Sequence, residues 1–369
     1  MNNSLQELGW KSTFEGSFEP FRGRFEPGRV TIEHRGQYVV LTEKGEVSAT
    51  VAGKLMHQAT GREDYPAVGD WVALTPPSAD YKAQIQAILP RVSKFARKAA
   101  GAVTEEQIVA ANIDLVFICM GLDADYNLRR LERYLAAAWE SGALPVVVLT
   151  KADLCEAELD ERLRDAEAVA IGAEVLPISS INGEGLGTVK GMLTAGKTGA
   201  LIGSSGVGKS TLINHLLGFE RQTIGEVRTG DGRGRHTNTH RELILLEGGG
   251  LLVDTPGMRE LHLMDLAGSG VEGAFEDIEQ LAQNCRFRDC HHRREPGYAV
   301  KEALRVGNLD ARRLESYEKL QREQAMIERK AARRQAMLEK RSFHASGSGT
   351  TDRNGRNDWV RDRAHDSES

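Results

Sequence analysis

The sequence predicts an α/β domain with a phosphate-binding loop, between an N-terminal β-barrel and a C-terminal helical domain. Three observations predict this class. Residues 1–100 hold short β-branched and aromatic runs separated by glycines, residues 101–270 alternate apolar strand runs with amphipathic helices, and residues 271–343 have a helical pattern. Residues 344–369 are polar and rich in small side chains, so we expect a disordered tail.

The composition is that of an ordinary globular protein. Hydrophobic residues make up 40%, charged residues 27%, and the formal net charge is -5. The whole-chain charge therefore does not indicate nucleic-acid binding, and any basic surface must be local. The sequence has no apolar run that could span a bilayer, and its first residues lack the pattern of a secretory signal. We expect a cytoplasmic protein with no membrane partner.

The first hundred residues predict a small barrel or sandwich. The expected strands are 30–32, 38–41, 47–55 and 71–74. A five-stranded oligonucleotide-binding (OB) barrel fits this spacing, and an SH3-like or other small barrel fits it equally well.

The pattern of the central region predicts a mostly parallel, doubly wound sheet. The strands are expected at 115–119, 145–149, 200–202 and 251–253, and the helices at 128–141 and 159–171.

A complete phosphate-binding loop follows the expected strand 200–202. Glycines let several backbone N–H groups face one phosphate, and the helix that follows adds favourable partial charge. Lys209 would reach the β- and γ-phosphates, and the Ser210 hydroxyl would bind Mg²⁺. The residues expected to bind nucleotide here are Gly203, Ser204, Ser205, Gly206, Val207, Gly208, Lys209, Ser210 and Thr211.

A carboxylate stands at the end of the next expected strand. Asp254 is where a Mg²⁺-coordinating aspartate belongs, and the N–H of Gly257 would approach the γ-phosphate. Thr237 and Thr239 lie between this motif and the phosphate loop, and one of them would close over Mg²⁺.

Two further motifs predict guanine recognition. Thr150, Lys151 and Asp153 follow the strand 145–149. The Asp153 carboxylate would accept from N1–H and N2–H₂ of guanine, a pair that adenine does not offer. Lys151 would lie along the base, and the loop of Ser179 and Ser180 would offer a backbone N–H to O6.

The order of these motifs is permuted. Ordinary GTPases place the phosphate loop first and the base motifs last, whereas here residues 150–153 and 178–180 precede residues 203–210. A permutation only moves the termini, so the same sheet can form. The segment after Asp254 then leads directly into the C-terminal domain, which suggests that the state of the γ-phosphate is transmitted there.

The permuted order, the run 232–237 and the Cys/His cluster before residues 295–297 resemble the RsgA family of ribosome small-subunit-dependent GTPases. The resemblance covers about residues 30–340. It implies an OB barrel, a permuted GTPase core, a C-terminal zinc domain, and a role in late assembly of the small ribosomal subunit. GTP hydrolysis, stimulated by the subunit, would favour release.

The zinc ligands implied by the resemblance are Cys285, Cys290 and His292. Tyr298 stands where the family has a further cysteine, and structural zinc requires four ligands. His291 is a possible substitute, and the alternative is a pair of free thiols.

The resemblance also implies that His236 positions the attacking water. Met258 occupies the position of the glutamine that Ras-like enzymes use, and it cannot orient water. With Lys209, His236 forms the expected catalytic pair. The alternative is that His236 only contacts phosphate or RNA.

The predicted function is therefore a monomeric GTPase that binds GTP or GDP with Mg²⁺, the small ribosomal subunit and its rRNA. Basic residues in the region 329–341 support contact with rRNA phosphates. Two alternatives are a P-loop ATPase or kinase, and a nucleotide-gated RNA-binding protein that does not hydrolyse GTP.

Overall fold

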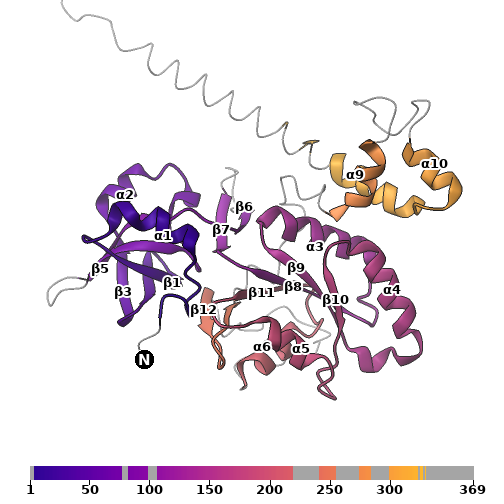
Figure 1. Ribbon diagram of the computed structural model, residues 1–369, viewed down its shortest axis with the longest axis horizontal. Helices are drawn as coiled ribbons and strands as arrows, with labels where there is room; N and C mark the ends of the chain where they lie inside the picture. The colour runs from indigo at the N-terminus through magenta and orange to yellow at the C-terminus, as the bar shows by residue number, and fades with distance from the viewer. Residues whose placement is uncertain are drawn as a thin grey trace, which may run out of the picture. The chain divides into compact units, whose positions relative to one another are not determined.

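The computed structural model describes residues 4–76, 82–98, 106–218, 241–254, 274–283 and 299–322, together with residues 325, 326 and 329. The chain divides into two compact units, residues 1–321 and 322–369. Nearly all described residues belong to the first unit (Figure 1).

Five strands close into a barrel in the order β1-β2-β3-β5-β4, with β4 pairing back to β1. β3 and β5 run parallel, and the other neighbours are antiparallel. A closed five-stranded barrel of this topology is the OB type and not the SH3-like alternative. The strands are β1 Glu26–His34, β2 Gln37–Thr42, β3 Gly45–Val51, β4 Trp71–Thr75 and β5 Ala83–Ile88.

One expected barrel strand is shorter than the sequence suggested. β3 ends at Val51, and the helix α2 (Gly53–Gln58) occupies residues that we expected to continue the strand to 55. The 3-10 helix η2 (Arg62–Asp64) follows. The β-branched run ends at Val51, and Gly53 begins a different backbone conformation.

The N-terminal segment packs against the outer face of β4, where Trp71 and Ala73 belong to a core separate from that of the barrel interior. It contains α1 (Ser12–Phe18) and the 3-10 helix η1 (Glu19–Phe21). Trp10 packs edge-on against Trp71 with ring centroids 4.7 Å apart, and Phe14 lies 5.9 Å from the same ring. Aromatic pairs in this range add to the gain from burial.

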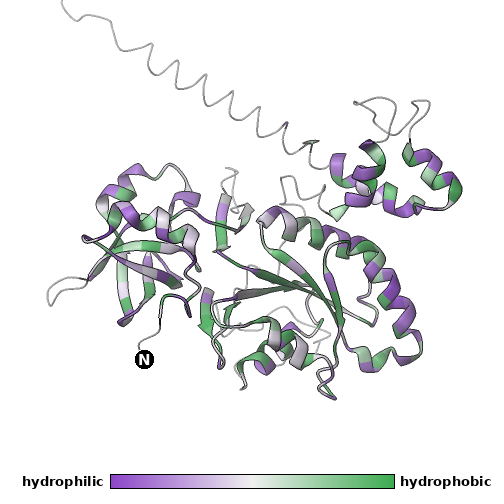
Figure 2. Cartoon of the chain, viewed as in Figure 1, coloured by the Kyte–Doolittle hydropathy of each residue, from purple (hydrophilic) through white to green (hydrophobic). Residues whose placement is uncertain are grey.

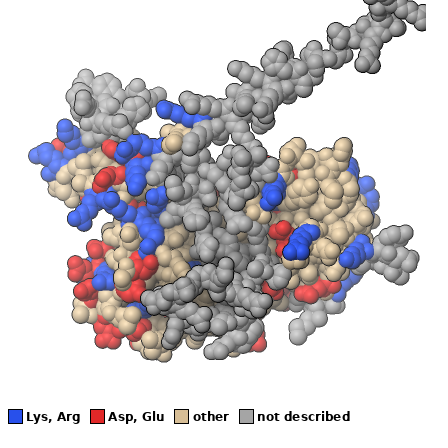
Figure 3. Space-filling view, turned by 180° about the vertical axis from the view of Figure 1, so that it is seen from behind, with Lys and Arg blue, Asp and Glu red and all other residues tan. Residues whose placement is uncertain are grey.

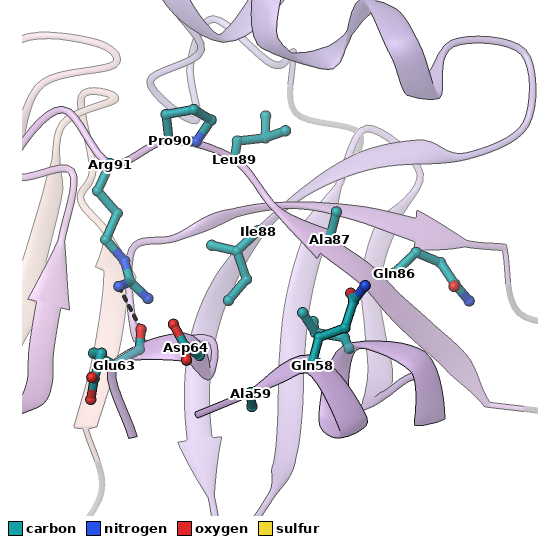
Figure 4. A pocket seen from close by; sticks show the side chains of 11 residues that line it. Gln58, Ala59, Glu63, Asp64, Gln86, Ala87, Ile88, Leu89, Pro90 and Arg91 are labelled. Atoms are coloured by element: carbon teal, nitrogen blue, oxygen red, sulfur yellow. Dashed lines mark hydrogen bonds between the residues drawn. The ribbon is translucent and has the colours of Figure 1, made fainter. Parts of the chain in front are cut away.

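An open groove of about 470 Å³ lies on the barrel between α2, η2 and β5 (Figure 4). Arg91 closes one end of it. Its guanidinium donates to both carboxylate oxygens of the buried Asp70, at 2.8 and 2.7 Å, and to the carbonyl oxygens of Glu63 and Tyr65, at 2.9 and 3.0 Å. Arg91 therefore fixes η2 to the strand end.

The α/β domain has a sheet in the order β10-β9-β8-β11-β13-β12. The first five strands are parallel, and β12 is antiparallel to β13. The strands are β8 Leu115–Gly121, β9 Leu144–Thr150, β10 Glu174–Pro177, β11 Thr198–Gly203, β12 Arg241–Leu245 and β13 Leu251–Asp254. The helices are α3 Leu128–Ser141, α4 Leu159–Val169, α5 Leu186–Met192 and α6 Lys209–Leu217, with the 3-10 helices η3 Ala152–Leu154 and η4 Glu156–Glu158.

Each face of this sheet has its own apolar core. Along β8, Val116, Ile118 and Met120 belong to the core beneath α3 and α4, whereas Phe117 and Cys119 belong to the core beneath α5 and α6. Period-2 alternation with both faces covered explains why the strands read as continuous apolar runs. These strands are the green centre of Figure 2.

The expected strands of this domain are confirmed, and the helix 128–141 has the expected bounds. Asn127 caps α3 by accepting from the Arg130 N–H at 3.0 Å, and Gly142 ends it with φ 82. The helix expected over 159–171 ends at Val169. Strands not expected from the sequence are β5, β10, β12, β6 Lys94–Lys98 and β7 Glu106–Ala111.

The barrel and the α/β sheet are joined through their strands. β1 pairs with β12, with Ile32 opposite Glu242 and Glu33 opposite Arg241. The two sheets form a single eleven-stranded sheet. The sequence pattern did not indicate this continuity.

The described C-terminal residues are helical, as expected. They form α9 (Glu276–Gln283), α10 (Ala299–Val306) and a helix over residues 311–322. Phe275, Ile278 and Leu314 share the core that contains Leu131 of α3. Among the described residues, none of the helices has the length and apolar character that crossing a bilayer would require.

Candidate functional site

The carboxyl ends of four parallel strands place the predicted motifs along one edge of the sheet. Gly121 of β8 lies opposite Thr150 of β9, and Gly203 of β11 lies opposite Cys119 of β8. β13 runs parallel to β11 and ends at Asp254. Ligands of open α/β sheets bind outside this edge.

The loop after β11 requires its glycines. Gly206 and Gly208 have φ of 80 and 98, in the left-handed region. Gly203 has φ 143, and a Cβ there would lie 2.3 Å from the carbonyl oxygen of Cys119. The chain therefore passes close to β8 and then enters α6 at Lys209.

Lys209 is buried at the base of this loop. Its ammonium donates to the carbonyl oxygen of Gly203 at 2.7 Å and also to that of Ser204. Burial raises the pKa of the nearby Cys119 thiol to about 12, although the charge of Lys209 opposes the rise. Cys119 is thus a neutral packing residue, and the loop has one fixed cation.

The other loop residues differ in exposure. Val207 is buried, Ser205 is exposed, and Ser204 and Ser210 are half-buried. Tyr134 of α3 shares a side-chain hydrogen bond with Ser204. Burial raises the pKa of Tyr134, and this hydrogen bond partly opposes the rise.

The end of β9 is bonded directly to the phosphate loop. The buried Thr150 hydroxyl lies 2.6 Å from the carbonyl oxygen of Val207 and 3.3 Å from that of Met120. The base motif and the phosphate motif, far apart in the sequence, are therefore in contact.

The two base-recognition loops are also bonded to each other. The Ser179 hydroxyl donates to the Asp153 carboxylate at 2.5 Å, and the Ala152 N–H donates to the carbonyl oxygen of Ile178 at 3.0 Å. Two apolar side chains flank these loops in exposed positions, Leu154 at 65% and Ile181 at 83%. The two loops therefore carry a carboxylate and two exposed apolar side chains, a combination that suits a flat heterocycle with N–H donors.

Some predicted residues lie outside the described part of the chain: His236, Thr237, Thr239, Gly257, Cys285, Cys290 and His292. Asp254 is described and is 8% exposed, opposite Glu242 on β12. No group of three or more potential metal-ligating side chains occurs among the described residues.

Comparison with known proteins identifies the family. The RsgA GTPase family model matches residues 88–264. The chain is 48% identical over 338 residues to "Small ribosomal subunit biogenesis GTPase RsgA" of Opitutus terrae, covering 89% of this chain and 91% of that protein. It is 42% identical over 343 residues to the protein of the same name from Streptomyces coelicolor, covering 92% of each. The chain belongs to the RsgA family.

Two solved structures share its fold. The crystal structure of YjeQ from Thermotoga maritima aligns with a TM-score of 0.64 at 26% identity, over 82% of this chain and 99% of that one. The structure of YloQ, described as a circularly permuted GTPase, aligns with a TM-score of 0.62 at 23% identity, over 83% of this chain and 96% of that one. The fold class predicted from the sequence, a permuted GTPase core with an OB-like barrel and a helical C-terminal region, is confirmed.

Sequence reasoning missed two side chains at this RsgA site. Tyr134 lies in the middle of α3 and bonds to Ser204 of the phosphate loop. In the sequence it looks like any other residue on the buried face of this helix, so nothing indicated the contact. Asp123 binds Lys151 across the sheet edge, with Nζ 2.6 Å from Oδ2. A carboxylate just beyond the strand 115–121 was a signal that could have found Asp123.

Proposed function

We propose that this protein is a GTPase that acts in biogenesis of the small ribosomal subunit. The observation that carries the proposal is the convergence of the loops 150–153, 178–180 and 203–210 at one sheet edge, in a chain of the RsgA family. A base-selecting carboxylate beside a phosphate loop supports GTP over ATP.

The base would bind between the loops of Asp153 and Ser179. Asp153 would accept from guanine N1–H and N2–H₂, Lys151 would lie along the base, and a backbone N–H near Ser180 would meet O6. The hydrogen bond from Ser179 to Asp153 supports this role, because it fixes the carboxylate in place before nucleotide arrives.

The phosphates would bind across residues 203–211. The buried ammonium of Lys209 and the start of α6 supply positive charge where the β- and γ-phosphates would lie. The oxygen ligands of Ser210 and Asp254, with Thr237 or Thr239, fit Mg²⁺, which when bound would neutralise phosphate charge.

Hydrolysis would depend on His236 to orient water, with Gly257 binding near the γ-phosphate. Met258 has no hydrogen-bonding group for this task. We therefore expect slow intrinsic turnover and strong stimulation by the small subunit.

The barrel is the proposed rRNA-binding part. OB barrels bind oligonucleotides through the strand 2–3 face and the loops beside it. Arg35 is exposed at the β1–β2 turn with φ 49, beside the exposed His34. The face drawn in Figure 3 has an area of mostly basic side chains next to an area of mostly acidic ones, with some of the opposite charge in each and a mixture elsewhere. The formal net charge of -5 does not reveal this local pattern. Arg35→Glu should weaken subunit binding, most strongly at low salt.

The finer parts of the proposal concern the rest of the chain. We propose a cytoplasmic monomer with a barrel over 1–100, a GTPase domain over 101–270, a helical domain over 271–343 and a tail over 344–369. We also propose that Cys285, Cys290 and His292 bind zinc. Metal analysis of the purified protein and of Cys285→Ala tests this, since equal, near-zero zinc in both would remove the zinc site.

The decisive test is single-turnover hydrolysis of GTP with and without purified small ribosomal subunits. We expect stimulation by the subunit, and its absence would contradict the ribosomal role. Asp153→Asn should shift nucleotide preference from guanine towards xanthine. Hydrolysis of ATP as readily as GTP by the wild type would instead favour a general P-loop ATPase.

A further inference from the structure

The loop between β8 and α3 holds one carboxylate in a fixed place. Within this loop, Asp123 Oδ1 accepts from the Asp125 N–H at 3.0 Å, and the Asp123 carbonyl oxygen accepts from the Tyr126 N–H at 3.1 Å. Arg162 donates to the carbonyl oxygen of Leu122 at 3.0 Å from outside the loop. One oxygen of Asp123 is therefore committed to its own loop, and Oδ2 is left for another partner.

That partner is Lys151, whose Nζ lies 2.6 Å from Oδ2. Lys151 has φ 62 and ψ 37, a left-handed conformation that is uncommon for a residue with a side chain. Both side chains are 31% exposed. Burial tends to raise the pKa of Asp123, but the Lys151 ammonium and the loop N–H groups outweigh it, so the pKa is lowered and the carboxylate stays charged.

We propose that Asp123 is a positioning residue for the guanine nucleotide, holding the Lys151 side chain extended beside Asp153. The inference rests on the proposed function. A free lysine chain has many rotamers, and ordering it against a base is unfavourable. Asp123 imposes that order when the protein folds, so that less freedom is lost when nucleotide binds.

The sign of the effect separates positioning from simple electrostatics. Nucleotide phosphates are anionic, so removing a nearby negative charge should by itself tighten binding. If Asp123 positions Lys151, removing its charge should weaken binding. Asn is a suitable replacement because its carbonyl can still accept from the Asp125 N–H, while its amide does not hold an ammonium.

The experiment measures the dissociation constant of a fluorescent GDP analogue for the full-length protein. We expect Asp123→Asn to bind about fivefold more weakly, the upper range for a partly exposed ion pair. KM for GTP should rise by the same factor with kcat unchanged, because the interaction is the same in ground and transition states.

Glu158→Gln is the matched control. Glu158 of η4 pairs with Arg162 of α4, with an N–O distance of 2.6 Å, and Arg162 also donates to the Leu122 carbonyl oxygen beside Asp123. The variant therefore removes one exposed negative charge near this loop without touching Lys151. Its affinity should equal or slightly exceed that of the wild type.

A double-mutant cycle completes the test. In a Lys151→Ala background, Asp123→Asn should have no further effect, because the partner it positions is gone. Equal or tighter GDP binding by Asp123→Asn, or full additivity with Lys151→Ala, would overturn the proposal. If Asp123→Asn does not fold, Asp123→Ser keeps an acceptor for the loop N–H and is measured in its place. Failure of the wild type to bind GDP would instead reject the proposed function.

Discussion

The α/β domain meets its two neighbours through different kinds of contact. On the barrel side the junction is held mainly by hydrogen bonds to the main chain, through the β1–β12 pairing and through Arg29, whose guanidinium donates to carbonyl oxygens. A partly exposed ion pair between Lys11 and Asp114 lies beside them. On the C-terminal side the contacts are between side chains, with Arg313 bound to Glu132 of α3 and to Asp277 of α9.

Arg29 joins three segments at the barrel junction. It donates to the carbonyl oxygens of Asn112 at 2.9 Å, Gly69 at 3.3 Å, and Leu8. Burial lowers the pKa of Arg29 to about 10, with the charges of Asp114 and Asp70 opposing the shift. Every hydrogen bond named here ends on the backbone, so the identity of the partner residues matters little.

Arg313 depends on particular carboxylates. Its guanidinium lies 3.1 Å from Glu132 Oε1, 2.7 and 2.8 Å from the two oxygens of Asp277, and 3.0 Å from the carbonyl oxygen of Ala274. Its carbon is 4.8 Å from the Phe275 ring centroid. Burial would lower the pKa of Arg313, but these carboxylates outweigh it and raise the pKa.

The comparison shows which junction a single substitution can break. A backbone ladder survives most side-chain changes, whereas a buried ion pair leaves an uncompensated charge when one partner is lost. Both junctions connect to the sheet edge that carries the predicted motifs. Ile32 of β1 is opposite Glu242, which is opposite Asp254, while α3 carries both Glu132 and the Tyr134 that bonds to Ser204.

The largest effect should come from Arg313→Ala. It leaves Glu132 buried without its cation, so we expect a loss of about 3–5 kcal/mol in the free energy of unfolding. Chemical denaturation measures it. Arg305→Ala, which removes an exposed arginine of α10, is the control and should have little effect. If Arg313→Ala and the wild type are equally stable, the C-terminal junction does not depend on this side chain, and the proposed difference between the two junctions is wrong.

Arg29→Ala should cost less, about 2–3 kcal/mol, because it leaves carbonyl oxygens rather than a charge unpaired. The β1–β12 pairing should persist. Hydrogen exchange of the strand amides measures this, and loss of protection at Ile32 together with Glu242 would mean that Arg29, not the ladder, holds the barrel in place.

A smaller, pH-dependent effect should belong to the C-terminal junction. Burial raises the pKa of Glu132, although Ser316 and Arg313 oppose it. The folded state therefore binds a proton at Glu132 more readily than the unfolded state does. Protonation of Glu132 increases the free energy of unfolding as the pH falls towards 4.5. The wild type should therefore gain stability relative to Glu132→Gln between neutral pH and pH 4.5, measured by thermal unfolding. A difference that is constant with pH would contradict this.

The smallest effect should come from Lys11→Met at the barrel junction. Lys11 pairs with Asp114 with a side chain that is 38% exposed, and Asp114 keeps a hydrogen bond from the Thr198 N–H at 2.9 Å. We expect less than about 1 kcal/mol by denaturation. A larger loss would show that side chains matter as much on this side as on the other.

The sequence alone determined the motifs and the elements that present them. Short-range patterns sufficed for this: apolar runs for β8, β9, β11 and β13, an amphipathic pattern for α3, and a fixed spacing of residues for the loop at 203–210. The permuted order of these motifs can also be read directly from the sequence, and it indicated the RsgA family.

Only the tertiary structure decided how those parts meet. β12 (RELIL) and β5 (AQIQAI) mix polar with apolar residues, and a strand is stabilised by its neighbours as much as by its own residues, so neither was apparent before the sheet was assembled. The barrel type depended on which strands close on each other. The contacts of Thr150 with Val207, Lys151 with Asp123 and Arg313 with Glu132 join residues far apart in the chain, at positions that no local pattern specifies.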